Sequence, residues 1–442
     1  MKKEIDLLHG PIFKTLGKLA VPIMLSGAFQ TAYNLTDMLW LGRLSASSVL
    51  AAGLAGMFLW FSSSVCGIVR SGTQVLTGQN IGAGKKKKSY EISSEGLRIS
   101  LLLGTLCLLA GILLAYPYIS FFNVESNETI KEAVLYLRIT ALALPFNFLA
   151  ITISGIFSAL GDSRTVFKIN AVSCLINIIF DPVLIFVFKM GIAGAALATS
   201  LAQFSGFILA LIYSLKNDFF KNLSFKLRTD NLTRKKIFQI GIPSGLSNML
   251  YALISMVISR QIASFGDNAV AAQKLGLQIE SVVYMMADGF GSACNIFTAQ
   301  NFGAGNKKRI KEGIKASLII ALIWGSICTV LLLVFPEEIF SFFIEDSEVI
   351  PYGAGYLRIM AYSEILNCIE ITCIGAFAGL GHTLPPSLIS IIFTAIRIPL
   401  ISVLSPVFGS DGAWLACSIS SSIKGILAYS VLYLRLNTYL EK

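Results

Sequence analysis

One segment of the chain occurs twice, and this repeat limits the possible folds more than any other feature of the sequence. Gln79–Gly84 reads QNIGAG, and Gln300–Gly305, 221 positions later, reads QNFGAG. Other matching pairs keep nearly the same offset: Val21-Pro22 with Ile242-Pro243, Tyr136–Ile139 with Tyr356–Ile359, and Leu160-Gly161 with Leu380-Gly381. Two related halves in an apolar chain are typical of a transporter built from two helix bundles around a shared cavity.

Composition indicates that these halves lie in lipid. Of the 442 residues, 55% are hydrophobic and 14% are charged, whereas about 25% of the residues of a soluble domain are charged. So few charges cannot cover a surface that faces water, and we expect the lipid bilayer to be the main partner of the chain. The net charge of +10 is expected in cytoplasmic loops, and it does not indicate a partner made of nucleic acid.

Long apolar runs predict the helices, because a helix needs about 20 mainly apolar residues to span the bilayer. Twelve runs qualify: 16–39, 49–78, 92–116, 130–157, 165–188, 192–214, 237–263, 268–299, 314–335, 350–379, 386–407 and 411–434. The predicted fold class is an all-α membrane protein with 12 transmembrane helices in two pseudo-symmetric six-helix bundles. We expect the N-terminal bundle at residues 1–215, a cytoplasmic linker at 216–236 and the C-terminal bundle at 237–442.

Basic residues predict which ends of the spans face the cytoplasm. They gather in the N-terminus, in the linker and in the loops after spans two, four and eight, including Lys85–Lys88 and Lys307–Arg309. The opposite loops carry acidic residues such as Glu337 and Glu338. Both termini are therefore expected in the cytoplasm. Since each half has six spans, the two halves share one orientation and form a parallel repeat.

The repeated glycine-rich element is interpreted as a helix stop. Its glycines permit the tight bends that end a helix, and the bases that follow suit a helix C-terminus at the cytoplasmic face. A cradle for phosphate is the functional alternative, but the segment lacks the pattern of a phosphate-binding loop. We therefore favour a structural role.

Two acids in predicted spans are candidate ion ligands, because a carboxylate in hydrocarbon is costly unless it is paired, hydrated or neutralised. Asp37 lies in the first span. Asp181 lies in the fifth, on one helix face with Asn177 and directly before Pro182, which frees a backbone carbonyl. With a rise of about 1.5 Å per residue, Thr199 in span six reaches a similar depth. Such oxygens can hold sodium, or the two acids can share a proton; alternatively, each acid is satisfied locally.

The second half does not repeat this acid pair. By the repeat offsets, Asp37 corresponds to Ile258 and Asp181 to Ile398. The polar residues of the second half are Glu280 and Asp288 in span eight, Glu364 and Glu370 in span ten and Arg397 in span eleven. Arg397 could pair with one of these glutamates, either in a structural ion pair or at a ligand site. Aromatic and methionine side chains suit bulky lipophilic cations, although helix packing is the simpler interpretation. The candidate substrate-binding residues are Gln30, Asn34, Tyr251, Glu280, Tyr284, Met286 and Arg397.

With these features the chain resembles the multidrug and toxic compound extrusion (MATE) transporters. The resemblance covers nearly all of it: two six-span halves, the paired prolines, the doubled QNxGAG element and Ala159–Ser163 after span four. It implies an antiporter in which sodium or protons enter as an organic, often cationic, compound leaves. The residues that match the first-half cation site of the DinF-like branch are Asp37, Asn177 and Asp181, with Tyr33 and Thr199 fitting the same pattern. The NorM-like branch often has an acid in span seven, which 241–263 lacks.

The expected protein is a cation-coupled (Na+ or H+) multidrug efflux antiporter of the plasma (inner) membrane, acting as a monomer on small organic cations or drugs. A flippase for lipid-linked precursors is the alternative, but it needs a strongly basic central cavity. An enzyme is not expected, because no pair of nucleophile and base is readable. No cofactor is expected either, because neither the eight cysteines nor the two histidines have the spacing of a metal site.

Overall fold

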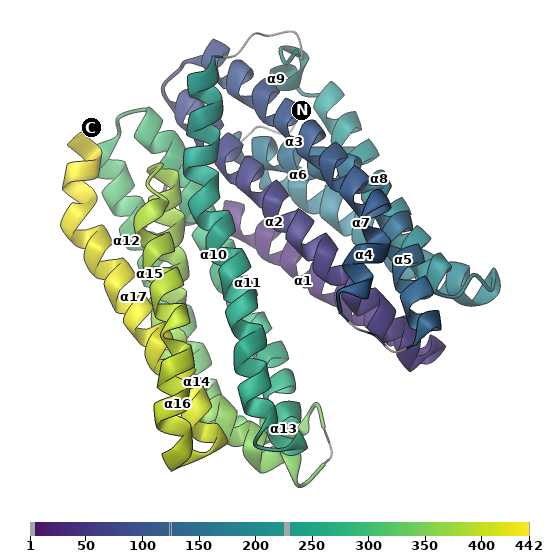
Figure 1. Cartoon of the computed structure of the whole chain (residues 1–442). Helices are drawn as coiled ribbons and strands as arrows, with labels where there is room; N and C mark the ends of the chain where they lie inside the picture. Colours follow the sequence, from purple (N-terminus) through teal and green to yellow (C-terminus); the bar gives the residue numbers. More distant parts are fainter. Residues whose placement is uncertain (1–4, 123, 125, 225–229, 345, 442) are drawn as a thin grey trace. The chain divides into compact units, whose positions relative to one another are not determined.

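The computed structural model of the chain describes residues 5–122, 124, 126–224, 230–344 and 346–441, apart from the side chain of Ala46. The regular structure of these residues is helical (Figure 1). Ten of the described helices are long and apolar enough to cross a membrane, and the count rises to eleven if the pair Asn127–Ala141 and Leu144–Ala159, bent by 49°, forms one span. The chain is therefore a multi-span membrane protein. The predicted span 268–299 lies in a helix, Asp267–Gly303, that is not among those ten.

Contacts divide the described chain into two compact units that exchange short segments. The first unit contains residues 21–242, and the second contains 6–20 together with the chain from 243 onward. Helix α1 (Ile12–Leu44) therefore begins in the second unit, and helix α10 (Asn231–Ala263) begins in the first. Both exchanges end beside the repeated prolines, at Val21-Pro22 and at Ile242-Pro243.

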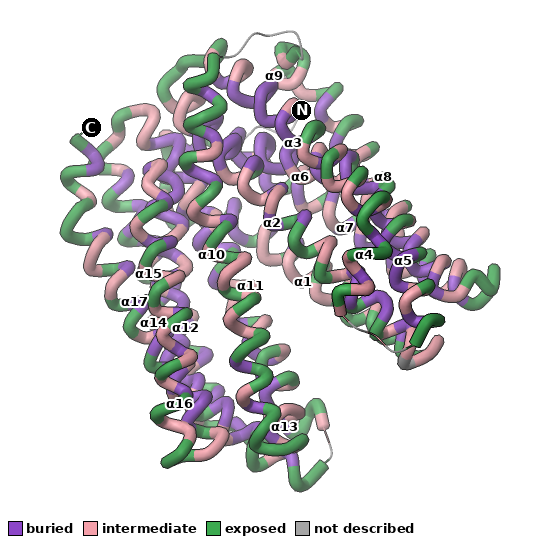
Figure 2. Tube along the Cα trace, in the orientation of Figure 1, coloured by how far each residue is buried: buried purple, intermediate pink, exposed green. Residues whose placement is uncertain are grey.

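The remaining helices follow this division. Those of the first unit are α2 (Ala46–Gly82), α3 (Lys86–Leu113), α4 (Ala115–Ser120), α5 (Asn127–Ala141), α6 (Leu144–Ala159), α7 (Ser163–Pro182), the π-helical turn η1 (Val183–Val187), α8 (Ile192–Leu215) and α9 (Asp218–Lys221). Those of the second unit are α11 (Asp267–Gly303), α12 (Lys307–Val334), α13 (Pro336–Ser341), α14 (Val349–Gly379), α15 (Leu384–Ala395), α16 (Arg397–Phe408) and α17 (Ser410–Glu441). Buried and exposed residues alternate along most of these helices (Figure 2), as expected where one helix face packs in the core.

The two QNxGAG elements end α2 and α11 with the same geometry. Gly84 and Gly305 both have φ of 71°, a left-handed conformation that favours glycine. The side-chain amides of Asn80 and Asn301 donate to the carbonyls four residues earlier, at 2.8 and 2.9 Å. These features are those of a helix C-cap, and they support the structural interpretation of the element.

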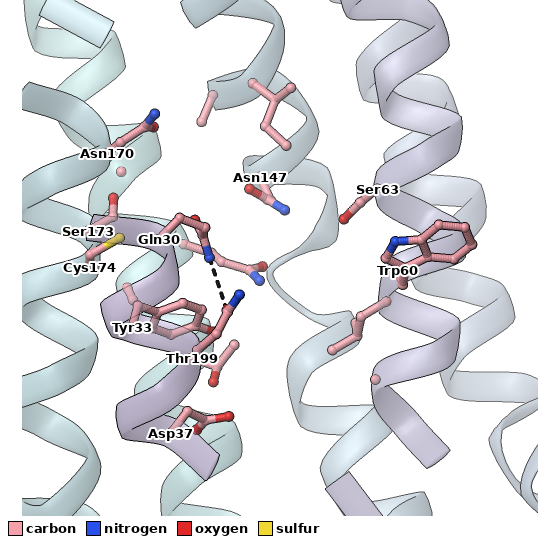
Figure 3. Close-up of a pocket in the computed structure, with 18 of the residues that line it drawn as sticks. Gln30, Tyr33, Asp37, Trp60, Ser63, Asn147, Asn170, Ser173, Cys174 and Thr199 are labelled. Atoms are coloured by element: carbon pink, nitrogen blue, oxygen red, sulfur yellow. Dashed lines mark hydrogen bonds between the residues drawn. The ribbon is translucent and has the colours of Figure 1, made fainter. Parts of the chain in front are cut away.

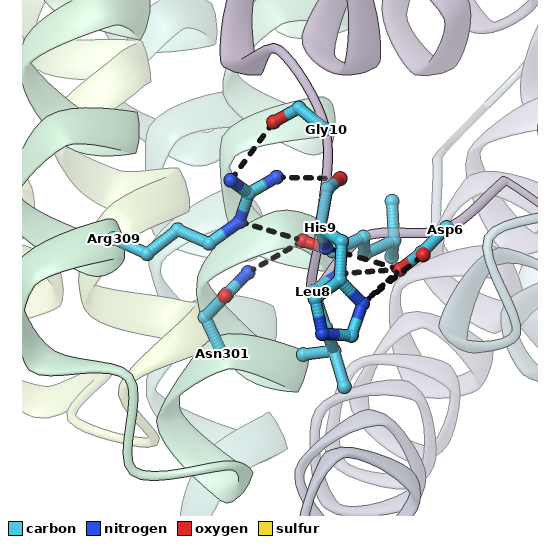
Figure 4. A network of polar contacts seen from close by, with 7 residues as sticks. Asp6, Leu8, His9, Gly10, Asn301 and Arg309 are labelled. Carbon is cyan, nitrogen blue, oxygen red and sulfur yellow. Dashed lines mark hydrogen bonds and ion pairs between the residues drawn. The ribbon is translucent and has the colours of Figure 1, made fainter.

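The second copy of this turn also holds the N-terminal segment of the chain (Figure 4). The guanidinium of Arg309 donates to the backbone carbonyls of Leu7, His9 and Gly10, at 3.1, 2.9 and 2.9 Å. The amide of Asn301 donates to the same Leu7 carbonyl at 3.1 Å. Because three carbonyls converge on one arginine, the segment before α1 is fixed to the second unit.

Candidate functional site

The candidate cation site lies in the first unit, where α7 ends at a proline. Pro182 has no backbone N–H, so the regular helix stops there and continues as the wider π-helical turn η1. Asp181 is held in this last turn of α7. Asp37, near the end of α1, and Thr199, in α8, complete the set of side chains that the sequence placed at one depth.

The site is buried and its acids are neighbours. Asn177 and Asp181 are both 0% exposed, Thr199 is 3% exposed and Asp37 is half-buried. The Asn177 amide donates to Asp181 Oδ1 at 3.4 Å, a long hydrogen bond. The carboxyl groups of Asp37 and Asp181 are close enough to interact directly. The two acids of the sequence prediction therefore lie together and share one environment.

Four oxygens of this site have no hydrogen-bond partner among the described residues. They are Asp37 Oδ1, Asp181 Oδ2, Asn177 Oδ1 and Thr199 Oγ1. A buried oxygen without a partner costs about 1–3 kcal/mol, so four such atoms at one place indicate a ligand for them. Carboxylate, amide and hydroxyl oxygens are the ligands that hard cations prefer. The donor set therefore fits a sodium ion, and the two carboxyl groups alone fit a shared proton.

A pocket opens beside this site within the first unit. Its volume is about 630 Å³, and it is lined by residues of α1, α2, α5, α6, α7 and α8. Figure 3 shows Tyr33, Asp37 and Thr199 along one side of it, with Trp60 and Ser63 on the other. Such a volume suits a drug-sized molecule.

Of the predicted site residues, five line this pocket: Gln30, Tyr33, Asn34, Asp37 and Thr199. The Gln30 amide donates to Asn34 Oδ1 at 3.2 Å (Figure 3). Asn177 and Asp181 are not part of the lining. Sequence reasoning missed Trp60, Asn147, Asn170 and Gln203, and it did not place Arg70 in a pocket. Their signal was available, because polar side chains are unusual in apolar spans.

The remaining candidate substrate-binding residues belong to the second unit, where Glu280 and Arg397 are the buried ones among them. The Tyr284 hydroxyl donates to Glu280 Oε2 at 3.1 Å, and the Asn367 amide donates to the Tyr284 oxygen at 3.4 Å. Glu364 is 0% exposed, and neither of its carboxyl oxygens has a hydrogen-bond partner among the residues that the structure describes. Tyr251 is exposed, and Met286 is half-buried.

Among the described residues, Arg397 forms no ion pair with a glutamate. Glu370 instead pairs with Lys424, at 3.2 Å, and both side chains are buried. Arg397 is 6% exposed and donates to the hydroxyls of Ser420 and Ser421, at 3.2 and 2.7 Å. Its guanidinium lies over the ring of Tyr251, 5.9 Å from the centroid. Lys424 therefore supplies the positive charge beside Glu370.

A family model named MatE matches residues 22–183 and 243–403, so each match begins at a repeated proline. The chain belongs to the MatE family. MatE proteins are transporters, so this membrane protein is a transporter and not an enzyme. The two matched segments cover most of both sequence repeats, which agrees with the resemblance that the repeats suggested.

Similar proteins span the whole MatE chain. A probable multidrug resistance protein, YoeA, of Bacillus subtilis is 28% identical, over 95% of this chain and 93% of its own. A probable multidrug resistance protein, NorM, of Thermotoga maritima is also 28% identical, over 91% and 88%. A solved structure of MATE in complex with MaD3S has a TM-score of 0.94 at 20% identity and covers 100% of both chains. The similarity to this solved structure shows that the two proteins share one fold.

Proposed function

We propose that this MatE protein is a cation-coupled multidrug efflux antiporter of the plasma membrane, which exports organic, often cationic, compounds by alternating access. Two similar proteins of nearly full length are named as probable multidrug resistance proteins, which supports the substrate class. One observation supports the coupling: four oxygens that have no hydrogen-bond partner in the described part of the chain lie together beside a drug-sized pocket. The ion would bind to the oxygens and the compound in the pocket.

Helix α1 connects the binding of the ion with the binding of the compound, because it carries residues of both sites. Asp37 belongs to the ion site, and Asn34 and Gln30, about one and two turns earlier on α1, line the pocket. An ion that draws Asp37 toward Asp181 would also move the pocket side chains of α1. An ion and a compound that favour different positions of α1 exclude each other, and this exclusion is the requirement for antiport.

The donor set favours sodium over a proton as the coupling ion. A shared proton uses only the carboxyl groups of Asp37 and Asp181. Sodium also uses neutral oxygens, and those of Asn177 and Thr199 at this site have no hydrogen-bond partner within the described chain. In this proposal the two acids supply charge, and the amide and the hydroxyl complete the coordination.

The architecture proposed with this function is a monomer of two pseudo-symmetric six-helix bundles, at residues 1–215 and 237–442. A linker at 216–236, of which 225–229 lie outside the described residues, joins the bundles in the cytoplasm. Both termini face the cytoplasm, as the basic loops indicate. The matching first-half site residues support a place near the DinF-like branch.

Transport into proteoliposomes under separate sodium and proton gradients tests this function, with a dye-like organic cation as reporter. We expect a sodium gradient to drive exchange, and Asp37→Asn together with Asp181→Asn to abolish it. Glu128→Gln is the control, because Glu128 is an exposed acid in the first turn of α5. Ion-driven exchange that survives the double replacement would exclude this site.

The same assay separates the antiporter from the flippase. Among the described residues that line the pocket, Arg70 is the only base, and it shares the pocket with Asp37. A pyrophosphate requires more positive charge than one arginine provides. Lipid pyrophosphate binding that depends on Arg397, without ion-driven export, would favour the flippase.

A further inference from the structure

The segment before α1 is fixed to the second unit by one arginine, although most of α1 belongs to the first unit. Residues 6–20 lie in the second unit, and α1 from Val21 onward, with Asp37 of the candidate ion site, lies in the first. We propose that Arg309 is a positioning residue for transport. It ties the start of α1 to the second unit, so that ion binding at Asp37 is linked to movement of that unit. This inference rests on the proposed function, because it takes Asp37 as an ion ligand.

The segment held by the arginine, residues 6–10, has an ordered shape of its own. The Asp6 carboxylate accepts hydrogen bonds from the backbone N–H groups of Leu8 and His9, at 3.0 and 3.1 Å. Such a turn is fixed by a side chain that replaces a backbone acceptor. Leu7 is only 1% exposed, whereas Asp6 and His9 are exposed. One buried apolar side chain therefore seats the segment, and one carboxylate shapes it.

Arg309 uses all three of its guanidinium nitrogens on this segment (Figure 4). Its Nε, Nη1 and Nη2 donate to the backbone carbonyls of Leu7, Gly10 and His9, respectively. The guanidinium also lies over the buried ring of Phe297, 5.2 Å from the centroid. A planar guanidinium presents its donors in a fixed geometry, whereas the ammonium of a lysine is a single point on a flexible stem. The arginine side chain therefore acts as a rigid clamp.

The first copy of the repeat provides a comparison for this clamp. By the offset of 221 positions, Arg309 corresponds to Lys88 and His9 corresponds to Asp230, which directly precedes α10. Lys88 Nζ lies 3.7 Å from a carboxylate oxygen of Asp230, but the two side chains are 40% and 57% exposed. An ion pair so exposed contributes little. Both copies therefore place a base beside the segment that leads into a helix, and the second copy replaces a surface ion pair with three charge-assisted hydrogen bonds.

Helix α1 links the clamp with the ion site. It runs as one α-helix from Ile12 to Leu44, and with a rise of about 1.5 Å per residue Asp37 lies about 38 Å from its first residue. Leu16 and Leu19, in its first turns, are at most 1% exposed and belong to the second unit. In alternating access the second unit moves against the first, and the clamped start of α1 must follow this movement. An ion that holds Asp37 in the first unit therefore favours some positions of the second unit over others, which is the condition for coupling.

Sodium binding and sodium-driven transport, measured on the same variants, test this role. In purified full-length Arg309→Gln we expect radioactive sodium to bind at least as tightly as to the unmodified protein, because the ion no longer acts against the second unit. In proteoliposomes the maximal rate of sodium-driven exchange of a dye-like organic cation should fall at least about tenfold, since one hydrogen bond from a charged group is typically equivalent to about that factor. Arg309→Lys keeps the charge and one donor, and it should recover part of the exchange.

Two further variants separate the clamp from a general loss of structure. Lys88→Gln is the matched control from the first copy, and its exchange should stay within about twofold of that of the unmodified protein. Leu7→Ser removes the buried seat of the segment and should reduce exchange as Arg309→Gln does. The two changes together should cause no further loss, because both release the same segment.

The outcomes distinguish this inference from the function on which it rests. Exchange that survives Arg309→Gln in full would overturn the role of the clamp and leave the proposed function standing. Sodium binding that falls in proportion to exchange would also overturn it, because Arg309 would then only support the fold. An unmodified protein that shows no ion-driven exchange would refute the proposed function, and this inference with it.

Discussion

At the scale of single residues, the neutral ligands decide which ion the site binds. Thr199→Val keeps the shape of the side chain and removes one oxygen from the site. We expect the sodium concentration for half-maximal transport to rise about tenfold, since one lost ligand is equivalent to about 1.4 kcal/mol. The measurement is sodium-driven uptake in proteoliposomes. Thr73→Val is the control, because Thr73 is also buried with a partnerless hydroxyl but does not line the pocket. An unchanged sodium dependence in Thr199→Val would favour the shared proton.

A second residue-scale prediction concerns the buried ion pair of Lys424 with Glu370. Lys424→Met leaves a carboxylate buried without its cation, and such a change typically destabilises a protein by about 3–5 kcal/mol. Replacing both residues, with Glu370→Leu added, removes the uncompensated charge and should recover most of the stability. Thermal unfolding in detergent measures both effects. A double variant as unstable as Lys424→Met would show that the pair does more than balance charge.

These residues also show what sequence can and cannot predict. Asp37 and Asp181 were predictable, because an acid in an apolar span needs a local reason. The partner of Glu370 was not predictable, because Lys424 and Arg397 lie in different helices and only the packing of α14 against α17 decides between them. The pocket side chains Asn147 and Asn170 are neutral, so their presence in a span gave a weaker signal than a charge does.

At the scale of elements, Gly194 in α8 of the first unit can be compared with Gly412 in α17 of the second unit. A Cβ added to Gly194 would lie 2.7 Å from the backbone carbon of Leu184, in η1 directly after Asp181-Pro182. In the second unit, a Cβ on Gly412 would lie 2.6 Å from the equivalent carbon of Leu404. Each glycine therefore permits the close approach of a helix to the backbone opposite it.

Replacing either glycine with alanine should lower the stability of the protein, but only one of the two replacements should affect transport. Both Gly194→Ala and Gly412→Ala should lower stability by about 1–3 kcal/mol, because the backbone opposite must move. Only Gly194→Ala should weaken the dependence of transport on sodium. Its neighbour η1 directly follows Asp181-Pro182 of the ion site, whereas the neighbour of Gly412 has no such acid beside it. Unfolding temperature and sodium-dependent transport measure the two effects. Equal losses of sodium activation in the two variants would contradict the assignment of the site to the first unit.

The helices and the turns that end them were more predictable than single side-chain contacts, because both halves of the sequence repeat the motifs that form them. The doubled QNxGAG and Leu-Gly pairs correspond to turns with nearly equal backbone angles: Gly84 and Gly305 at 71°, Gly161 and Gly381 at 83° and 81°. The exchange of α1 and α10 between the units was not predictable. Hydrophobic runs show that a helix exists, but they do not show which bundle its first turns contact.

At the scale of the whole molecule, this exchange means that each half of the chain needs the other. The start of α10 packs on α2 through facing glycines: a Cβ on Gly72 would collide with the Ile237 carbonyl, and one on Gly241 with that of Ile68. Ile237 is fully buried, and Arg234 forms an ion pair with the buried Glu95 of α3. The first unit is therefore incomplete without residues 231–242, which come from the end of the linker and the start of the second half.

A chain cut in the linker tests this dependence. Fragments 1–224 and 225–442, expressed together, should assemble and copurify, because residues 231–242 supply a missing part of the first unit. Fragment 1–224 alone should aggregate, since it exposes the buried surface of α2 around Gly72. Copurification is measured with a tag on one fragment only.

Glycine variants make the cause of assembly specific. Gly72→Ala should reduce copurification severely, because the added methyl group meets backbone that cannot move without separating the two helices. Gly67→Ala, in the same helix, is the control, since its added Cβ has no neighbour within 4 Å. If both variants copurify as the unmodified fragments do, the close approach of α10 to α2 contributes little to assembly. If only Gly72→Ala fails, the first turns of α10 hold the two halves together, and the repeat encodes two bundles that complete each other.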